Sequence, residues 1–169
     1  FLFPLEKEEI EQINAFYKVG TAEKDLKEGI RYLKAGDSER AKKYFRKAAK
    51  AGNAEAQKRL GDCYYYEGGE KNKKEAVKWY QKSAAQGDAT AQMKLAYMYA
   101  WGIGVWRNLE KAVEWLMQAT KCDEGEAQAL VGYMYEQASK KKILGDYTYF
   151  EVAKEYYQKA AEQNYIPAQ

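Results

Sequence analysis

An Ala-Gln dipeptide recurs along the chain, and this recurrence constrains the fold more than any other feature of the sequence. The four copies begin at residues 56, 91, 127 and 168, at intervals of 35, 36 and 41 residues. Such periods are typical of arrays in which each repeat is a small unit that buries its apolar face only against its neighbours. The sequence therefore predicts a tandem array rather than one compact core.

Each repeat contains two segments with helical spacing. In the first half the apolar positions lie four residues apart, as in Ala91, Leu95 and Tyr99. In the second half an alanine stands three residues before an aromatic residue, as in Ala112 and Trp115. Residues three and four apart share one face of an α-helix, so each half is predicted to form one helix. The differences in repeat length fall between the halves, which indicates a loop there.

The first predicted helix of each repeat carries a small residue at one fixed position: Gly61, Ala96 or Gly132. A side chain this small lets the first helix approach the second helix closely. A tyrosine follows three residues later in every repeat, at Tyr64, Tyr99 and Tyr135, and we expect these rings to pack between helices.

Helix starts are also marked in the second halves. Asn72 with Glu75 and Thr148 with Glu151 have the spacing of a capping box, and Asn108 occupies the equivalent cap position. In a capping box each side chain satisfies a backbone N–H that the first helical turn leaves free. Each repeat is thus expected to consist of a helix, a loop and a second helix.

The repeats resemble those of a known family. The segments AEAQKRLGDCYYYEGGEKNKKEAVKWYQKSAAQGD and ATAQMKLAYMYAWGIGVWRNLEKAVEWLMQAT are similar to Sel-one-like repeats (SLR), which are related to tetratricopeptide repeats. The resemblance covers residues 54–169, with Ala96 in place of glycine and Thr120 in place of alanine as departures. It implies an all-α fold, a right-handed α/α superhelical solenoid of antiparallel helix pairs.

Upstream, the spacing of small and aromatic residues looks more like a tetratricopeptide unit, and the first residues form an apolar helix pattern after Pro4. We expect that terminal helix to cover the apolar face of the first repeat. The expected segments are an N-terminal capping helix (1–21), a tetratricopeptide-like pair (22–53), three Sel-one-like repeats (54–88, 89–124 and 125–165, the last with an extended loop) and the start of a further repeat (166–169).

The composition argues against catalysis. The chain has no histidine, which removes imidazole bases, His-activated nucleophiles and histidine metal sites. Cys63 and Cys122 lie in different repeats at non-equivalent positions, so we interpret them as ordinary thiols rather than a disulfide or a zinc site. No P-loop is present. We expect no catalytic residue, no metal and no cofactor.

Charge and hydropathy limit the kinds of partner that the chain is expected to bind. The 28 basic and 25 acidic residues alternate along most of the chain, so nucleic-acid binding is not indicated. No stretch reaches the ~18 apolar residues of a membrane span. The resemblance slightly favours a bacterial extracytoplasmic location, periplasmic or secreted, and leaves a cytoplasmic one open. The oligomeric state is also left open.

A partner would bind on the side of the first helices that faces away from the second helices. In solenoids of this family that side lines the concave groove, and tyrosine and tryptophan are frequent interface anchors. Packing between repeats is an open alternative for the tyrosines of this set. The candidate residues are Lys58, Asp62, Tyr65, Met93, Tyr97, Trp101, Tyr133 and Glu136, together with Trp106 in an interhelical loop.

These features favour a noncatalytic scaffold or adaptor that binds a partner protein or peptide in the concave groove. Two alternatives follow from the resemblance. One is an immunity or inhibitor protein that blocks a secreted bacterial effector. The other is a cell-wall-related enzyme, which the absence of histidine and of an SxxK motif disfavours.

Overall fold

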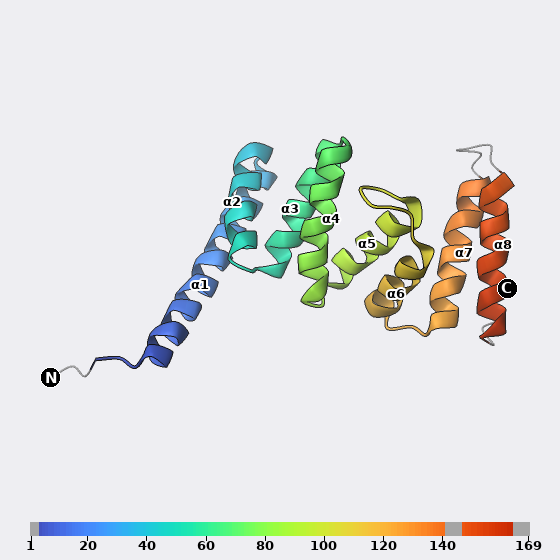
Figure 1. Cartoon of the computed structure of the whole chain (residues 1–169). Coiled ribbons are helices and arrows are strands. Elements are labelled where there is room, and N and C mark those ends of the chain that lie inside the picture. Colours follow the sequence, from blue (N-terminus) through green and yellow to red (C-terminus); the bar gives the residue numbers. More distant parts are fainter. Residues whose placement is uncertain (1–3, 141–146, 164–169) are drawn as a thin grey trace. The chain divides into compact units, whose positions relative to one another are not determined.

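The chain is all-α, as predicted. The computed structural model describes residues 4–140 and 147–163, and these residues form eight helices and no strand. Figure 1 shows the helices in chain order. They are α1 (Lys7–Lys34), α2 (Ser38–Lys50), α3 (Ala54–Glu67), α4 (Glu70–Ala85), α5 (Ala89–Trp101), α6 (Leu109–Thr120), α7 (Glu124–Lys140) and α8 (Tyr147–Glu162).

The helices divide into two compact units. Unit 1 (Phe1–Asp88) contains α1 to α4, and unit 2 (Ala89–Gln169) contains α5 to α8. Within each unit every helix packs against the next one in the chain, most extensively in the pairs α1–α2, α3–α4, α5–α6 and α7–α8. Each pair joins the two halves of one repeat, which confirms that each half forms one helix.

A small residue on the first helix and a large one on the second helix fit together in each pair. A Cβ atom added to Gly61 on α3 would lie 2.7 Å from Cδ1 of Tyr80 on α4, too close for any real contact. In the α5–α6 pair the equivalent positions are Ala96 and Leu116, both buried. A ring on the second helix thus goes with glycine on the first, and the smaller leucine goes with alanine. The glycine contact recurs between Gly29 and Phe45 and between Gly132 and Tyr157.

The turns between repeats place a left-handed residue before a helix cap. Between α2 and α3, Gly52 has a φ of 97° and the side chain of Asn53 accepts a hydrogen bond from a backbone N–H of α3 at 2.8 Å. Between α6 and α7, Lys121 has a φ of 55°, and Asp123 caps α7 with a hydrogen bond of 2.9 Å. A residue with a Cβ pays about 1 kcal/mol for this backbone, and glycine does not. The turn in unit 2 is therefore strained where the turn in unit 1 is not.

One of the three predicted helix starts is correct. Asn108 caps α6 and accepts a hydrogen bond from the N–H of Lys111 at 2.9 Å. Asn72 instead lies inside α4, because Gly68 and Gly69, with φ of 73° and 77°, end α3 and begin α4 earlier than expected. Thr148 likewise lies inside α8, which begins one residue before it.

The N-terminal helix differs most from the expectation. The apolar pattern of residues 5–19 does form a helix, but α1 continues through residue 21 without a break and packs against its neighbours only from Ala22 onward. Its first half extends beyond α2 (Figure 1). The side chains of Ile10, Ile13, Phe16 and Tyr17 are 42% to 77% exposed, so they do not cover the first repeat.

The structure also locates the predicted interior tyrosines, the cysteines and the extended loop. The predicted interior tyrosines Tyr99 and Tyr135 are buried, and Tyr64 is half-buried. Both cysteines are free thiols. The extended loop of the last repeat (141–146) and the start of a further repeat (166–169) lie outside the described residues. No helix among the described residues is long and apolar enough to cross a membrane.

Candidate partner-binding site

The clearest candidate surface is one face of α5. Met93, Tyr97 and Trp101 follow one another at intervals of four residues, so they share a side of the helix. Met93 is 45% exposed and Tyr97 47% exposed, whereas Trp101 is half-buried. We call these three residues the α5 aromatic face. It lies within unit 2, and the sequence predicted all three of its members.

Two aromatic rings, one from α7 and one from α8, pack against Trp101 of this face. Trp101 stacks on Tyr135 of α7, with ring centroids 4.6 Å apart and an angle of 19° between the planes. Tyr149 of α8 meets both rings edge-on at 5.6 Å. The hydroxyl of Tyr135 donates a hydrogen bond to the carbonyl oxygen of Ala100, and burial raises the pKa of this hydroxyl. Trp101 is therefore held in place, and Tyr97 rests beside it at 6.2 Å.

The indole N–H of Trp101 is buried and has no hydrogen-bond acceptor within the described part of the chain. A buried donor without an acceptor costs about 1 to 3 kcal/mol. Such groups are uncommon in folded proteins. The sequence identifies Trp101, but only the three-helix packing reveals this unused donor.

The two candidates on α7 have different roles. Tyr133 is 54% exposed and available to a partner. Glu136 is already engaged, because its carboxylate accepts a hydrogen bond from the hydroxyl of Tyr157 at 2.7 Å and pairs with Lys140 at 2.5 Å. The hydrogen bonds from Lys140 and Tyr157 lower the pKa of Glu136. Burial and the bond to Glu136 raise the pKa of Tyr157 to about 12. Glu136 therefore links α7 to α8 through its hydrogen bond with Tyr157.

The three candidates in unit 1 are also engaged internally. Lys58 pairs with Glu55 at 2.6 Å and with Asp88 at 3.5 Å. Burial lowers the pKa of Lys58, but these two carboxylates outweigh that effect and leave the pKa raised. Asp62 accepts a hydrogen bond from the hydroxyl of Tyr80 at 2.6 Å. Tyr65 is half-buried and meets Tyr66 edge-on. These interactions lie within unit 1, so the three side chains are less available to a partner.

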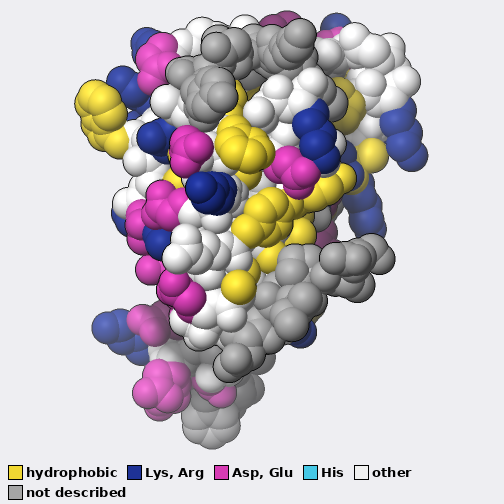
Figure 2. All heavy atoms as spheres, turned by 90° about the vertical axis from the view of Figure 1, so that its right-hand side faces the viewer, with side chains coloured by type: hydrophobic (Ala, Val, Ile, Leu, Met, Phe, Trp, Pro, Cys, Tyr) yellow, Lys and Arg dark blue, Asp and Glu magenta, His cyan; other side chains and the backbone are white. Residues whose placement is uncertain are grey.

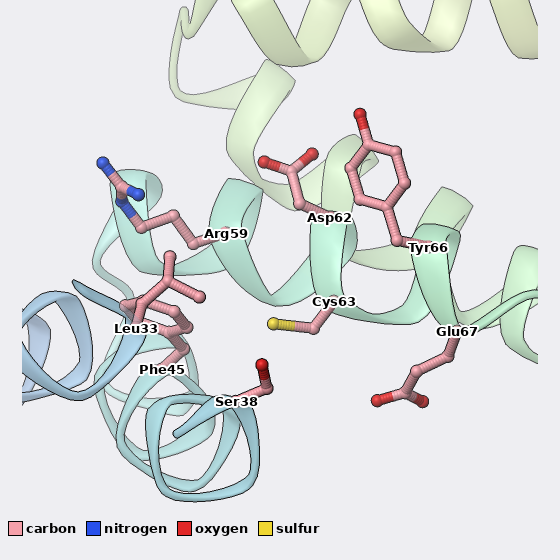
Figure 3. A pocket seen from close by; sticks show the side chains of 8 residues that line it. All are labelled: Leu33, Ser38, Phe45, Arg59, Asp62, Cys63, Tyr66 and Glu67. Atoms are coloured by element: carbon pink, nitrogen blue, oxygen red, sulfur yellow. The ribbon is translucent and has the colours of Figure 1, made fainter. Parts of the chain in front are cut away.

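Unit 1 contains a cavity of about 440 Å³ that the sequence did not reveal. Figure 3 shows that α3 forms one wall and that residues of α1 and α2 form the other, with the thiol of Cys63 pointing into the space between them. Among the predicted candidates only Asp62 lines it. Residues from three helices meet here, which no single spacing pattern predicts. The lining residues are Leu33, Ser38, Phe45, Arg59, Asp62, Cys63, Tyr66 and Glu67.

The charged groups of this cavity already have partners. Arg59 pairs with Glu55 at 2.7 Å, and Glu67 pairs with Lys42 at 2.5 Å. Burial raises the pKa of the Cys63 thiol, which disfavours the reactive thiolate. The cavity therefore lacks an activated nucleophile or an unpaired charge that would indicate a reaction.

The remaining candidate, Trp106, lies in the loop between α5 and α6 and is 94% exposed. It is separate from the packed rings that support Trp101. Figure 2 shows the side of unit 2 that carries α7 and α8, where hydrophobic side chains are interspersed with charged ones.

The described residues contain no group of three or more histidine, cysteine, aspartate or glutamate side chains that could hold a metal ion. Tandem antiparallel helix pairs define an α/α repeat protein of the solenoid class. The chain belongs to the Sel1 repeat family, because the family model matches residues 15–53, 54–88, 89–123 and 125–165. Proteins of this family are generally noncatalytic scaffolds for protein interactions.

The first of these four matches spans the pair that the sequence likened to a tetratricopeptide unit. It begins at residue 15, inside the exposed half of α1, rather than at residue 22. The family model thus treats this pair as a Sel1 repeat like the other three.

Two solved bacterial structures are similar to the chain. A Sel1 repeat protein from Oxalobacter formigenes is 34% identical, with a TM-score of 0.58, over 84% of this chain and 58% of that one. A protective antigen present in uropathogenic Escherichia coli strains, which displays an SLR fold, is 30% identical with the same TM-score. The match covers 92% of this chain and 33% of the antigen. The chain thus spans less than two thirds of both proteins. No curated protein matches it significantly.

Proposed function

We propose that the chain is a noncatalytic scaffold that binds a peptide segment of a partner protein, with the α5 aromatic face and Tyr133 as its contact residues. The observation that carries the proposal is the exposure of Met93 and Tyr97 beside a tryptophan held by packed rings. Large side chains that are already ordered lose little conformational entropy on binding, which favours them as interface anchors.

The exposed side chains of α5 support a peptide segment as the ligand. A segment lying along this helix covers the apolar surface of Met93 and Tyr97, which are 45% and 47% exposed. The candidate residues of unit 1 are weaker candidates for partner contacts, because Lys58 and Asp62 already have ionic or hydrogen-bonded partners.

Affinity capture from native lysate, followed by titration of the recovered partner, tests this proposal. The variant Tyr97→Ala/Tyr133→Ala removes two exposed rings without touching the buried core. We expect it to bind the partner at least about tenfold more weakly than the wild-type chain, since truncation of an anchor residue commonly costs about 2 kcal/mol.

A matched control is Tyr66→Ala, which removes a ring that is 76% exposed in unit 1. We expect this variant to recover the same partner with wild-type affinity. Equal recovery of every partner by the double variant and the wild-type chain would show that the α5 aromatic face and Tyr133 are not the contact surface.

A further inference from the structure

The helix α1 carries two apolar stripes on opposite sides, and only one of them is used within unit 1. Successive residues turn by about 100° around a helix. The residues that pack toward α2, such as Ala22, Leu26 and Gly29, lie on one side of α1. Ile10, Ile13 and Tyr17 lie about 160° away by the same geometry. All three are exposed, so this second stripe has no partner within the described chain.

The second stripe is bordered by opposite charges at its two ends. Glu6 and Lys24 are 18 residues apart, which is five helical turns, so they point in the same direction as the stripe. Glu9 and Lys27 are also 18 residues apart, and they lie about 60° around the helix from Glu6 and Lys24, at one edge of the stripe. We call this surface the outer face of α1: an acidic end, an apolar centre and a basic end along one side of the helix.

Gly20 lies on the outer face, and no close packing contact explains a glycine there. A glycine inside a helix costs about 1 kcal/mol relative to alanine. At Gly29 the ring of Phe45 explains the glycine, because an added Cβ would lie 2.6 Å from it. A Cβ at Gly20 would meet no atom within 4 Å. The missing side chain therefore leaves room for something outside the chain.

We propose that the outer face of α1 binds a second copy of this chain, with the two α1 helices antiparallel across a twofold axis near Phe16 and Tyr17. An antiparallel copy places Glu6 and Glu9 opposite the partner's Lys27 and Lys24 at both ends of the contact. A twofold interface is built from the same patch on both subunits, so the patch must be its own complement. The order of acid, apolar and base meets that requirement.

The same pairing accounts for Gly20 and for the apolar centre. When Glu6 lies opposite the partner's Lys27, Ile13 lies opposite the partner's Gly20, where no side chain blocks its approach. A parallel copy would instead place acid against acid and base against base. The apolar centre is smaller than the ~800 Å² per subunit of a stable interface, so the dimer is expected to form reversibly with concentration.

Sedimentation equilibrium of the full chain over a dilution series tests the pairing. The wild-type chain should shift from monomer to dimer as its concentration rises. Tyr17→Glu should weaken the dimer at least about tenfold, because a charge replaces a buried ring in both subunits. Val19→Glu is the matched control: Val19 is also exposed, at 60%, but lies off the outer face, and its substitution should leave the dimer unchanged.

Charge reversal tests the orientation. At low salt, Lys24→Glu/Lys27→Glu should weaken the dimer about tenfold, since both ends become acidic. Adding Glu6→Lys/Glu9→Lys should restore it, because each end again meets its opposite. Circular dichroism must confirm that α1 keeps its helix in the fourfold variant, since Glu9 also accepts a hydrogen bond from the N–H of Glu6 at 2.9 Å.

Three outcomes overturn the inference. A monomer at every concentration shows that the outer face does not bind a second copy. A dimer that Tyr17→Glu leaves intact places the interface elsewhere. A dimer that weakens with Tyr17→Glu but ignores every charge reversal rules out the antiparallel arrangement. None of these results bears on the α5 aromatic face, whose contact residues lie in unit 2.

Discussion

The pair α3–α4 of unit 1 and the pair α7–α8 of unit 2 use the same internal contact but leave different surfaces. In each pair a glycine on the first helix packs against a tyrosine ring on the second helix. The hydroxyl of Tyr80 binds Asp62, which directly follows its glycine, whereas the hydroxyl of Tyr157 binds Glu136, one helical turn further on. In the α7–α8 pair the residue that directly follows the glycine is therefore not needed as an acceptor, and this residue is Tyr133.

The α5–α6 pair extends the same comparison. Its second helix carries Leu116 in place of the tyrosine, and leucine needs no hydrogen-bond acceptor. The position equivalent to Asp62 is Tyr97, which is 47% exposed. A surface position becomes available for binding whenever the interior no longer needs an acceptor there. The repeats thus differ in surface exposure at the position where their internal hydrogen bonds differ.

The largest expected effect concerns the glycine contact. Gly61→Ala should lower the free energy of unfolding by about 2 kcal/mol, because the new Cβ pushes into the Tyr80 ring. Adding Tyr80→Leu reproduces the alanine and leucine of α5–α6 and should cost much less than the two single changes combined. Urea unfolding of the four proteins measures this coupling, and strictly additive costs would contradict the proposed fit.

The next prediction compares the hydrogen bonds that the hydroxyls of Tyr80 and Tyr157 donate. Tyr80→Phe should cost about 1.5 kcal/mol, because it leaves the carboxylate of Asp62 without this donor. Tyr157→Phe should cost less than about 0.5 kcal/mol, since Glu136 keeps its ion pair with Lys140. Hydrogen exchange of the α3–α4 and α7–α8 amides measures both. Equal costs would mean that the hydrogen bonds of Tyr80 and Tyr157 stabilise their helix pairs equally.

A stabilising change is expected at the strained turn of unit 2. Lys121→Gly should raise the free energy of unfolding by about 1 kcal/mol, because glycine adopts the left-handed backbone without a steric penalty. The reverse change in unit 1, Gly52→Lys, should lower it by a similar amount. Thermal unfolding compares the two, and a loss of stability in Lys121→Gly would show that the lysine side chain contributes more than its backbone costs.

The smallest effect is electrostatic. The pKa of Glu136 is lowered in the folded chain, so its contribution is present above the unfolded pKa and lost as the pH falls through the folded pKa. Tyr157→Phe removes one of the two hydrogen bonds that lower it, so the pKa of Glu136 should rise toward its ordinary value. NMR titration of the Glu136 carboxyl carbon measures the shift, with Tyr133→Phe as a control that should leave it unchanged.

Much of the fold follows from the repeat alone. The period, the four-residue spacing and the small residues at 61, 96 and 132 predict the helix pairs and their close contact, because each reflects packing within a few helical turns. The helix starts were harder to predict. Gly68 and Gly69 shift the start of α4 through their backbone conformation, which competes with the side-chain cap expected at Asn72.

The candidate site was predictable only in part. Helical spacing places Met93, Tyr97 and Tyr133 on exposed faces, as the structure shows. It does not reveal that Asp62 bonds to Tyr80, 18 residues away, because that contact depends on how two helices face each other. The same reason hides the rings beneath Trp101, which come from different helices. Spacing along one helix predicts exposure, whereas partners on other helices require the structure.

The glycine contact also limits how such an array can change by recombination. A crossover inside the α3–α4 pair that replaced α3 with α5 would bring the Cβ of Ala96 against the ring of Tyr80, since Ala96 takes the place of Gly61. A crossover between pairs, as after Asp88, keeps each small residue with its own large partner. The unit that can be duplicated without disturbing this contact is therefore the helix pair. A single helix copied without its partner helix would need further substitutions to pack closely again.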